Sequence, residues 1–106
     1  MTEVVLIYSL FPNAGEAHDC CRALLAEKLI ASASRFSPAI SYFHADGDIA
    51  TSEEHPVFFK TNSALADKAM GRIAQMHRYH APAIIAIKAS DSHQPFSEWV
   101  DMQVLP

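Results

Sequence analysis

Two short segments of this chain are apolar at consecutive positions, and this limits the folds that it can adopt. They are residues 4–7, with the sequence Val-Val-Leu-Ile, and residues 83–87, with the sequence Ala-Ile-Ile-Ala-Ile. Apolar runs of this length, bounded by turn-forming residues, are typical of strands buried on both faces. Because successive side chains of a strand point to opposite faces, such strands place apolar groups on both sides of their sheet. Any fold of this chain must therefore cover both faces.

The pattern of the other residues predicts a helix between two strand segments. Residues 3–11 favour a strand, because most of them are β-branched or large and apolar. Asn13 is expected to cap a helix over residues 14–31, with Glu16 completing a capping box. The apolar positions of this helix recur at helical spacing, and they are Ala17, Cys21, Leu24, Leu25 and Leu29.

A long hairpin is expected after this helix. Residues 32–44 favour a strand, but Pro38 cannot donate to a sheet and marks an edge, a bulge or a bend. Asp46 and Gly47 tolerate the positive φ angles of a type I′ turn, so they predict the turn of the hairpin. The return strand is expected to pass through Ile49 and to end on an apolar stretch at residues 57–59.

A second helix over residues 64–78, a strand over residues 83–89 and one or two helical turns over residues 96–102 complete the expected order. The apolar face of the second helix is expected to contain Leu65, Ala69, Met70, Ile73 and either Met76 or His77. This order predicts an α+β fold, a ferredoxin-like split βαβ sandwich that forms a single domain over residues 1–106. Two helices then cover one face of a four-stranded antiparallel sheet.

The second apolar face of this sheet needs another cover. Left bare, it would exceed the few hundred Å² of apolar surface usual on a monomer. A second copy of the chain is the simplest cover, so we expect an oligomer. The alternative is that the tail containing Phe96 and Trp99 folds over this face, and these two aromatic residues are expected to be core or interface anchors.

Composition and charge disfavour several classes of protein. Eight basic residues against twelve acidic ones give a net charge of −4 without a basic cluster, which disfavours nucleic-acid binding. No apolar run reaches 18 residues, so no membrane span is expected. The start of the chain lacks the basic region of a secretory signal, so a cytoplasmic location is expected. The only cysteines, Cys20 and Cys21, are adjacent inside a helix, so neither a disulfide framework nor a reactive thiol is expected.

Several segments resemble one known family. Residues 25–33 read LAEKLIASA, residues 77–82 read HRYHAP and residues 96–99 read FSEW. They are similar to the LAEKLAAC, HPYxxP and YxxW segments of the CutA divalent-cation-tolerance proteins. The similarity continues, in order and at compatible spacing, at Asp46 and Gly47, at Glu54, and at Lys60 and Thr61.

This resemblance implies a ferredoxin-like subunit, a tight homotrimer similar in architecture to the PII signalling proteins, and a role in tolerance of copper and other divalent metals. The sequence departs from the family pattern at several positions. Ser9 and Ser32 stand where members carry cysteine, and Ala83 stands where a glutamate is common. The first proline of HPYxxP is Arg78, and Ala45 replaces an aromatic residue. The two serines remove the thiolates that Cu(I) favours.

Two histidines are candidate metal ligands. His77 and His80 lie three residues apart at the end of the second predicted helix, close enough to share Cu or Zn. A complete site would need further ligands, which we expect from a neighbouring subunit. The alternative is that His77 is a packed, hydrogen-bonded histidine and that His80 is solvated.

A cleft between subunits is the expected place for a ligand, either a metal ion or a small anion. The polar and aromatic residues expected there are Glu27, Glu54, Lys60, Tyr79 and Trp99. The alternative is that the charged members form salt bridges between subunits. No catalytic residue is assigned and no cofactor is required. We therefore expect a non-enzymatic, CutA-like homotrimer that responds to divalent metal ions. A PII-like effector-binding regulator and a small ferredoxin-like enzyme with an inter-subunit cleft are the alternatives.

Overall fold

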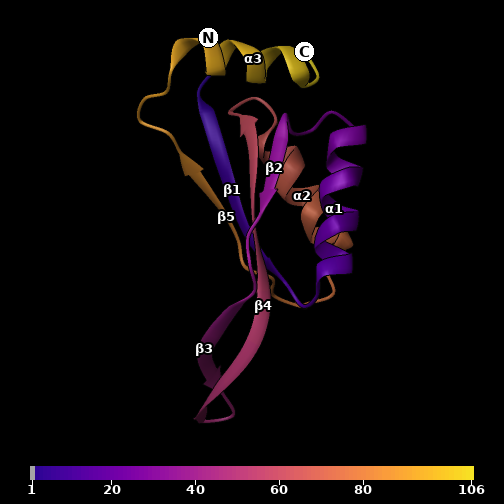
Figure 1. Cartoon of the computed structure of the whole chain (residues 1–106), viewed down its shortest axis with the longest axis vertical. Helices are drawn as coiled ribbons and strands as arrows, with labels where there is room; N and C mark the ends of the chain where they lie inside the picture. Colours follow the sequence, from indigo (N-terminus) through magenta and orange to yellow (C-terminus); the bar gives the residue numbers. More distant parts are fainter. Residues whose placement is uncertain (1) are drawn as a thin grey trace.

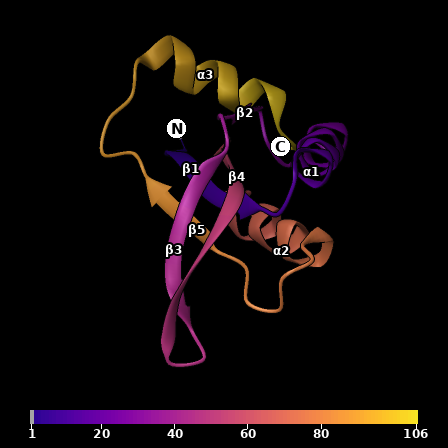
Figure 2. The same ribbon diagram turned by 60° about the horizontal axis from the view of Figure 1, so that its bottom comes forward.

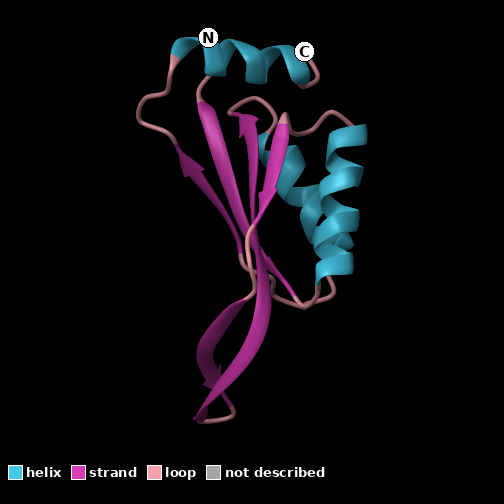
Figure 3. Cartoon of the chain, viewed as in Figure 1, coloured by secondary structure: helices cyan, strands magenta, loops and turns pink. Residues whose placement is uncertain are grey.

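The helices and strands follow one another in the predicted order. The structure is a computed structural model that describes residues 2–106, and Figures 1 and 3 show its elements. They are β1 (Val4–Phe11), α1 (Ala14–Ala26), β2 (Ser32–Arg35), β3 (Ala39–Ala45), β4 (Asp48–Asn62), α2 (Ala66–Met76), β5 (Ile84–Lys88) and α3 (Gln94–Gln103). The strand order is β2-β4-β1-β5, β3 pairs with β4, and every pairing is antiparallel. The predicted α+β class with an antiparallel sheet is confirmed.

The prediction of four strands was wrong by one, because Pro38 lies in a break between β2 and β3. β4 is long enough to pair with both pieces. Its second half lies between β1 and β2, and its first half pairs with β3. The β3–β4 hairpin therefore projects from the sheet as an arm, and the molecule measures 46 × 27 × 23 Å (Figures 1 and 2).

The turn at the tip of this arm has the predicted type I′ geometry. Asp46 has φ 51° and Gly47 has φ 78°, both in the left-handed region that this turn requires. Nothing lies within 4 Å of a Cβ placed on Gly47, so glycine is needed for its backbone angle and not for lack of space.

The main core lies between the sheet and helices α1 and α2. Its largest fully buried side chains include Ile7 and Phe11 of β1, Leu24 of α1, Phe59 of β4 and Ile73 of α2. These residues come from the inward-facing positions of each strand and from one face of each helix. No helix within residues 2–106 has both the length and the apolar character needed to cross a membrane.

Helix α1 begins as predicted but ends earlier. The Asn13 side chain accepts from the Glu16 N–H at 2.9 Å, which confirms the N-cap, and its amide donates to the Glu16 carboxylate at 2.7 Å. The helix ends at Ala26 and not at residue 31, because Lys28 turns into the left-handed region with φ 58°. The Leu29 N–H then bonds the carbonyl of Leu24 at 3.0 Å, which is the closing bond of a Schellman motif.

The shortened helix changes two of the predicted core positions. Leu25 is 42% exposed, so its assignment to the buried face was wrong. Leu29 is buried as predicted, but from the turn after the helix. Helix α2 is also shorter than predicted, by two residues at each end.

Helix α3 lies across one end of the sheet (Figures 1 and 2). Its Val100, together with Val104 just after it, packs against Val4, Ala31 and Leu65. Of the two roles predicted for Phe96 and Trp99, the core is wrong, because they are 37% and 41% exposed and stack on each other on α3; their role as interface anchors stays a prediction. The tail therefore covers the end of the sheet and leaves its second face uncovered.

This uncovered face is apolar, as the sequence predicts. Across it, Leu6 pairs with Ile87, and Tyr8 pairs with Ile85 on one side and Phe58 on the other. Ile85 is 52% exposed and Ile87 is 44% exposed. We call this surface the open face; its apolar members are Leu6, Tyr8, Phe36, Phe58, Ile85 and Ile87.

Candidate functional site

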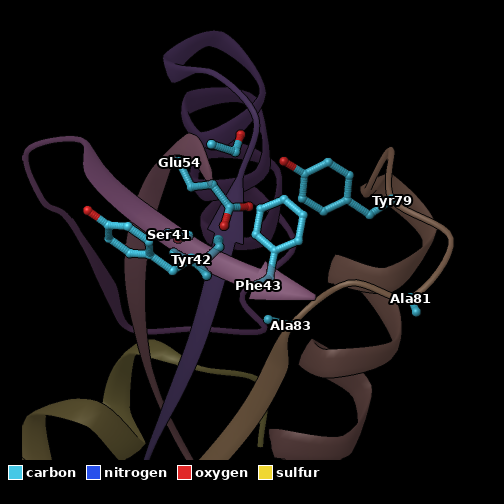
Figure 4. Close-up of a pocket in the computed structure, with 9 residues that line it drawn as sticks. Ser41, Tyr42, Phe43, Glu54, Tyr79, Ala81 and Ala83 are labelled. Carbon is cyan, nitrogen blue, oxygen red and sulfur yellow. The ribbon is translucent and has the colours of Figure 1, made fainter. Parts of the chain in front are cut away.

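A pocket lies where the β3–β4 arm leaves the sheet. It has a volume of about 620 Å³ and combines residues of β1, β3, β4 and the loop after α2, as Figure 4 shows. Its lining residues are Leu10, Ser41, Tyr42, Phe43, Ser52, Glu54, Tyr79, Ala81 and Ala83. Leu10 lies two positions along β1 from Tyr8, and Glu54 lies four positions along β4 from Phe58, so both follow the open face along their strands and the pocket adjoins that face.

Glu54 is the charged residue of this pocket. It is only 9% exposed and pairs with Ala39 at the start of the arm. The Tyr79 phenol lines the pocket together with it. Burial of the phenol, followed by its interaction with the neighbouring Glu54 carboxylate, raises the pKa of Tyr79, so the hydroxyl keeps its proton and is available as a donor.

His77 connects the loop that contains Tyr79 to strand β1 through two hydrogen bonds. Its Nε2–H donates to the Leu10 carbonyl at 2.6 Å, and its Nδ1 accepts from the backbone N–H of Tyr79 at 3.3 Å. Its ring stacks on Phe11 with centroids 4.7 Å apart. Because a carbonyl only accepts and an N–H only donates, these two bonds select the neutral tautomer with the proton on Nε2. His77 therefore fastens the loop after α2 to β1.

This arrangement affects the predicted metal site. Both ring nitrogens of His77 are engaged within the chain, and His80 is exposed. Residues 2–106 contain no group of three or more His, Cys, Asp or Glu side chains close enough to hold a metal ion. To bind a metal, His77 would have to give up one of its two hydrogen bonds, and other copies would have to supply ligands.

Only two of the five predicted ligand-binding residues meet in the pocket, and these are Glu54 and Tyr79. Glu27 lies at the end of α1 and forms a two-pronged ion pair with Arg72 of α2, with N–O distances of 3.0 Å. The Lys60 ammonium donates to Ser34, and Trp99 lies on the outer side of α3. Within one chain, these three side chains contribute nothing to the pocket.

Sequence reasoning missed the part of the pocket that comes from the arm. Ser41 and Phe43 of β3 and Ser52 of β4 line it, and Ser41 lies directly opposite Ser52. The signal was present in the turn, since a two-residue turn at Asp46 and Gly47 fixes which residues of the two strands face each other.

Cys21 is buried as predicted, and Cys20, which was not among the predicted core positions, is buried as well. Both thiols are free and buried. Burial, followed by the neighbouring Cys21, raises the pKa of Cys20 to about 12. A thiol held in this state is a poor nucleophile and a poor soft-metal ligand.

Comparisons with known proteins give one consistent result. The model of the family described as "CutA1 divalent ion tolerance protein" matches residues 5–103. A divalent-cation tolerance protein CutA of Thermotoga maritima is 29% identical over 102 residues, which covers 96% of this chain and all of the relative.

Two solved structures extend the similarity to the fold. The CutA1 of Ehrlichia chaffeensis superimposes with a TM-score of 0.94 at 31% identity, covering 97% of this chain and 96% of that one. The CutA of Archaeoglobus fulgidus, described as periplasmic, gives 0.92 at 30% identity, covering 96% of this chain and 99% of that one.

Proposed function

The chain belongs to the CutA1 divalent ion tolerance family, and on this basis we propose that it acts in tolerance of divalent metal ions such as copper, as a non-enzymatic homotrimer in the cytoplasm. The strand order supports a ferredoxin-like description in which β2 and β3 together form one interrupted strand. The assembly would bind a metal ion or another small ligand between its subunits.

The exposed apolar side chains of the open face are the observation that supports the proposed trimer. Phe36, Ile85 and Ile87 are each at least 44% exposed, although such side chains are stabilised by leaving water. Helices α1 and α2 cover the other face, and α3 covers one end, so another copy of the chain is the simplest remaining cover (Figure 1).

Sedimentation equilibrium tests this part of the proposal. A particle of three times the 11.7 kDa chain mass is expected at micromolar concentration. Ile85→Lys should lower that mass, because it places a charge on the open face. Ile49→Lys is the matched control, because Ile49 is also exposed, at 70%, but lies near the tip of the arm. A folded single chain at every concentration would contradict the proposal.

Equilibrium dialysis against Cu(II) and Zn(II) tests the metal. If His77 and His80 hold the ion, His77→Ala and His80→Ala should each reduce the metal retained, and His18→Ala on the exposed side of α1 should not. Retention that is unchanged in both variants would exclude these two residues as ligands. Cell fractionation tests the cytoplasmic location.

A further inference from the structure

Glu54 has no charged partner at the wall of the pocket. The ion pairs within residues 2–106 do not include it, although it is more than nine-tenths buried. A carboxylate in such a place is stabilised by hydrogen-bond donors or by an opposite charge. The Tyr79 hydroxyl in the same lining offers one donor, and a carboxylate has room for about four. The carboxylate can therefore accept further hydrogen bonds from a ligand in the pocket.

The other lining residues are neutral. Ser41, Ser52 and Tyr79 bring hydroxyl groups, and the rest of the surface is aliphatic or aromatic, without a Lys, Arg or His among the lining residues that the structure describes. Figure 4 shows the Phe43 ring beside the Glu54 carboxylate, with Tyr79 facing them. The pocket therefore combines one negative charge, a few hydroxyl oxygens and aromatic faces.

This combination discriminates between classes of ligand. An anion would meet the Glu54 carboxylate without any cation to offset the repulsion. A transition metal such as zinc needs three or four protein ligands of the His, Cys, Asp or Glu type, and the pocket offers one. An ammonium group needs only one carboxylate and two acceptors, and aromatic faces attract it further.

We propose that the Glu54 pocket binds a small organic cation, a primary amine with an apolar body. The ammonium group pairs with the Glu54 carboxylate and donates to the hydroxyl oxygens of Ser41 or Ser52. The apolar body lies against Phe43 and the aliphatic wall. This inference rests on the proposed ligand-binding role of the pocket and names the class of ligand. The net charge of −4 favours the approach of such a cation.

Isothermal titration calorimetry with three matched probes tests the class of ligand. Benzylamine, benzyl alcohol and benzoate share one ring and differ in charge. Benzylamine is expected to bind to the assembled wild-type protein, and the neutral and anionic probes are expected not to bind detectably over the same range. Equal binding of benzyl alcohol or benzoate, or no binding of benzylamine, would overturn the proposal. The last result is also expected if a neighbouring copy fills the pocket.

Glu54→Gln tests the residue. Removing the charge from one partner of a buried pair should weaken benzylamine binding roughly thirtyfold or more. Glu53→Gln is the matched control, because it removes the same charge one position away, where the side chain is 64% exposed, and binding should change less than twofold. An unchanged affinity in Glu54→Gln would overturn the proposal. If Glu54→Gln does not fold, the wild-type comparison of the three probes decides.

These measurements separate the two proposals. Metal retention without benzylamine binding would refute the organic cation and leave the proposed function in place. Benzylamine binding without metal retention would support the organic cation and remove the metal ion from the proposed function.

Discussion

Replacing His77 by phenylalanine tests whether this histidine fastens the wall of the pocket. Phenylalanine keeps a flat ring against Phe11, where the imidazole stacks with centroids 4.7 Å apart. It has no nitrogen, so the Leu10 carbonyl and the Tyr79 N–H both lose their partner within the chain. The substitution therefore removes the hydrogen bonds and preserves the packing.

The two hydrogen bonds differ in strength. The contact to Leu10 is short, at 2.6 Å, and its loss should cost about 1.5 kcal/mol, within the usual range for a group left without a partner. The contact from Tyr79 is long, at 3.3 Å and part-buried, and should cost about 0.5 kcal/mol. We expect His77→Phe to lower the free energy of unfolding by about 2 kcal/mol.

Urea denaturation followed by far-UV circular dichroism measures this change. All proteins are compared at one concentration, because assembly makes the apparent stability depend on concentration. His77→Gln should recover part of the loss, since its amide can donate to Leu10. His18→Phe at an exposed position of α1 should change the stability by less than about 0.5 kcal/mol. A His77→Phe protein as stable as the wild type would refute the argument.

Three further predictions follow from other contacts. The Thr2 hydroxyl and the Asn62 amide donate to Asp101 and hold the pKa of its carboxyl below 3.8, so the stability it contributes is present above that pH and is lost as the pH falls. Asp101→Asn should therefore reduce the loss of stability between pH 5 and pH 3 in urea titrations. The same loss of stability in the variant and in the wild type would argue against this role. Ellman's reagent at pH 8 should leave Cys20 unlabelled in the folded protein and label it in urea, because burial raises the pKa of its thiol to about 12; rapid labelling without urea would contradict this assignment. Lys28→Gly should raise the free energy of unfolding by about 0.5 kcal/mol by relieving the left-handed backbone, whereas Lys28→Ala should not, and equal stabilities of the two variants would count against strain at this position.

The features that were predicted correctly depend on neighbours in the sequence. Asn13 and Glu16 cap α1 across three residues, and Asp46 with Gly47 sets the turn of the arm. The apolar second face was also predictable, because alternation along a strand determines which side chains share a face.

The features that were missed depend on contacts distant in the sequence. The sequence carries no signal for the turn at Lys28 that ends α1, since no glycine or proline follows Ala26. The Ala31 N–H bonds the carbonyl of Lys60 at 2.8 Å, so pairing with β4 draws the segment after α1 away from helical geometry. Likewise, Glu54 and Tyr79 lie 25 positions apart in the sequence, and the loop that contains Tyr79 is held to β1 by the hydrogen bond between His77 and the carbonyl of Leu10.

One strand, β4, belongs both to the body of the molecule and to its arm. Its residues from His55 onward pair with β1, its residues up to Glu54 pair with β3, and the pocket opens at this junction (Figure 4). The junction that sets the angle between the arm and the sheet is therefore also the place where a ligand would bind. If the arm reaches a neighbouring copy, occupancy and assembly become thermodynamically linked, and each must strengthen or weaken the other by the same factor.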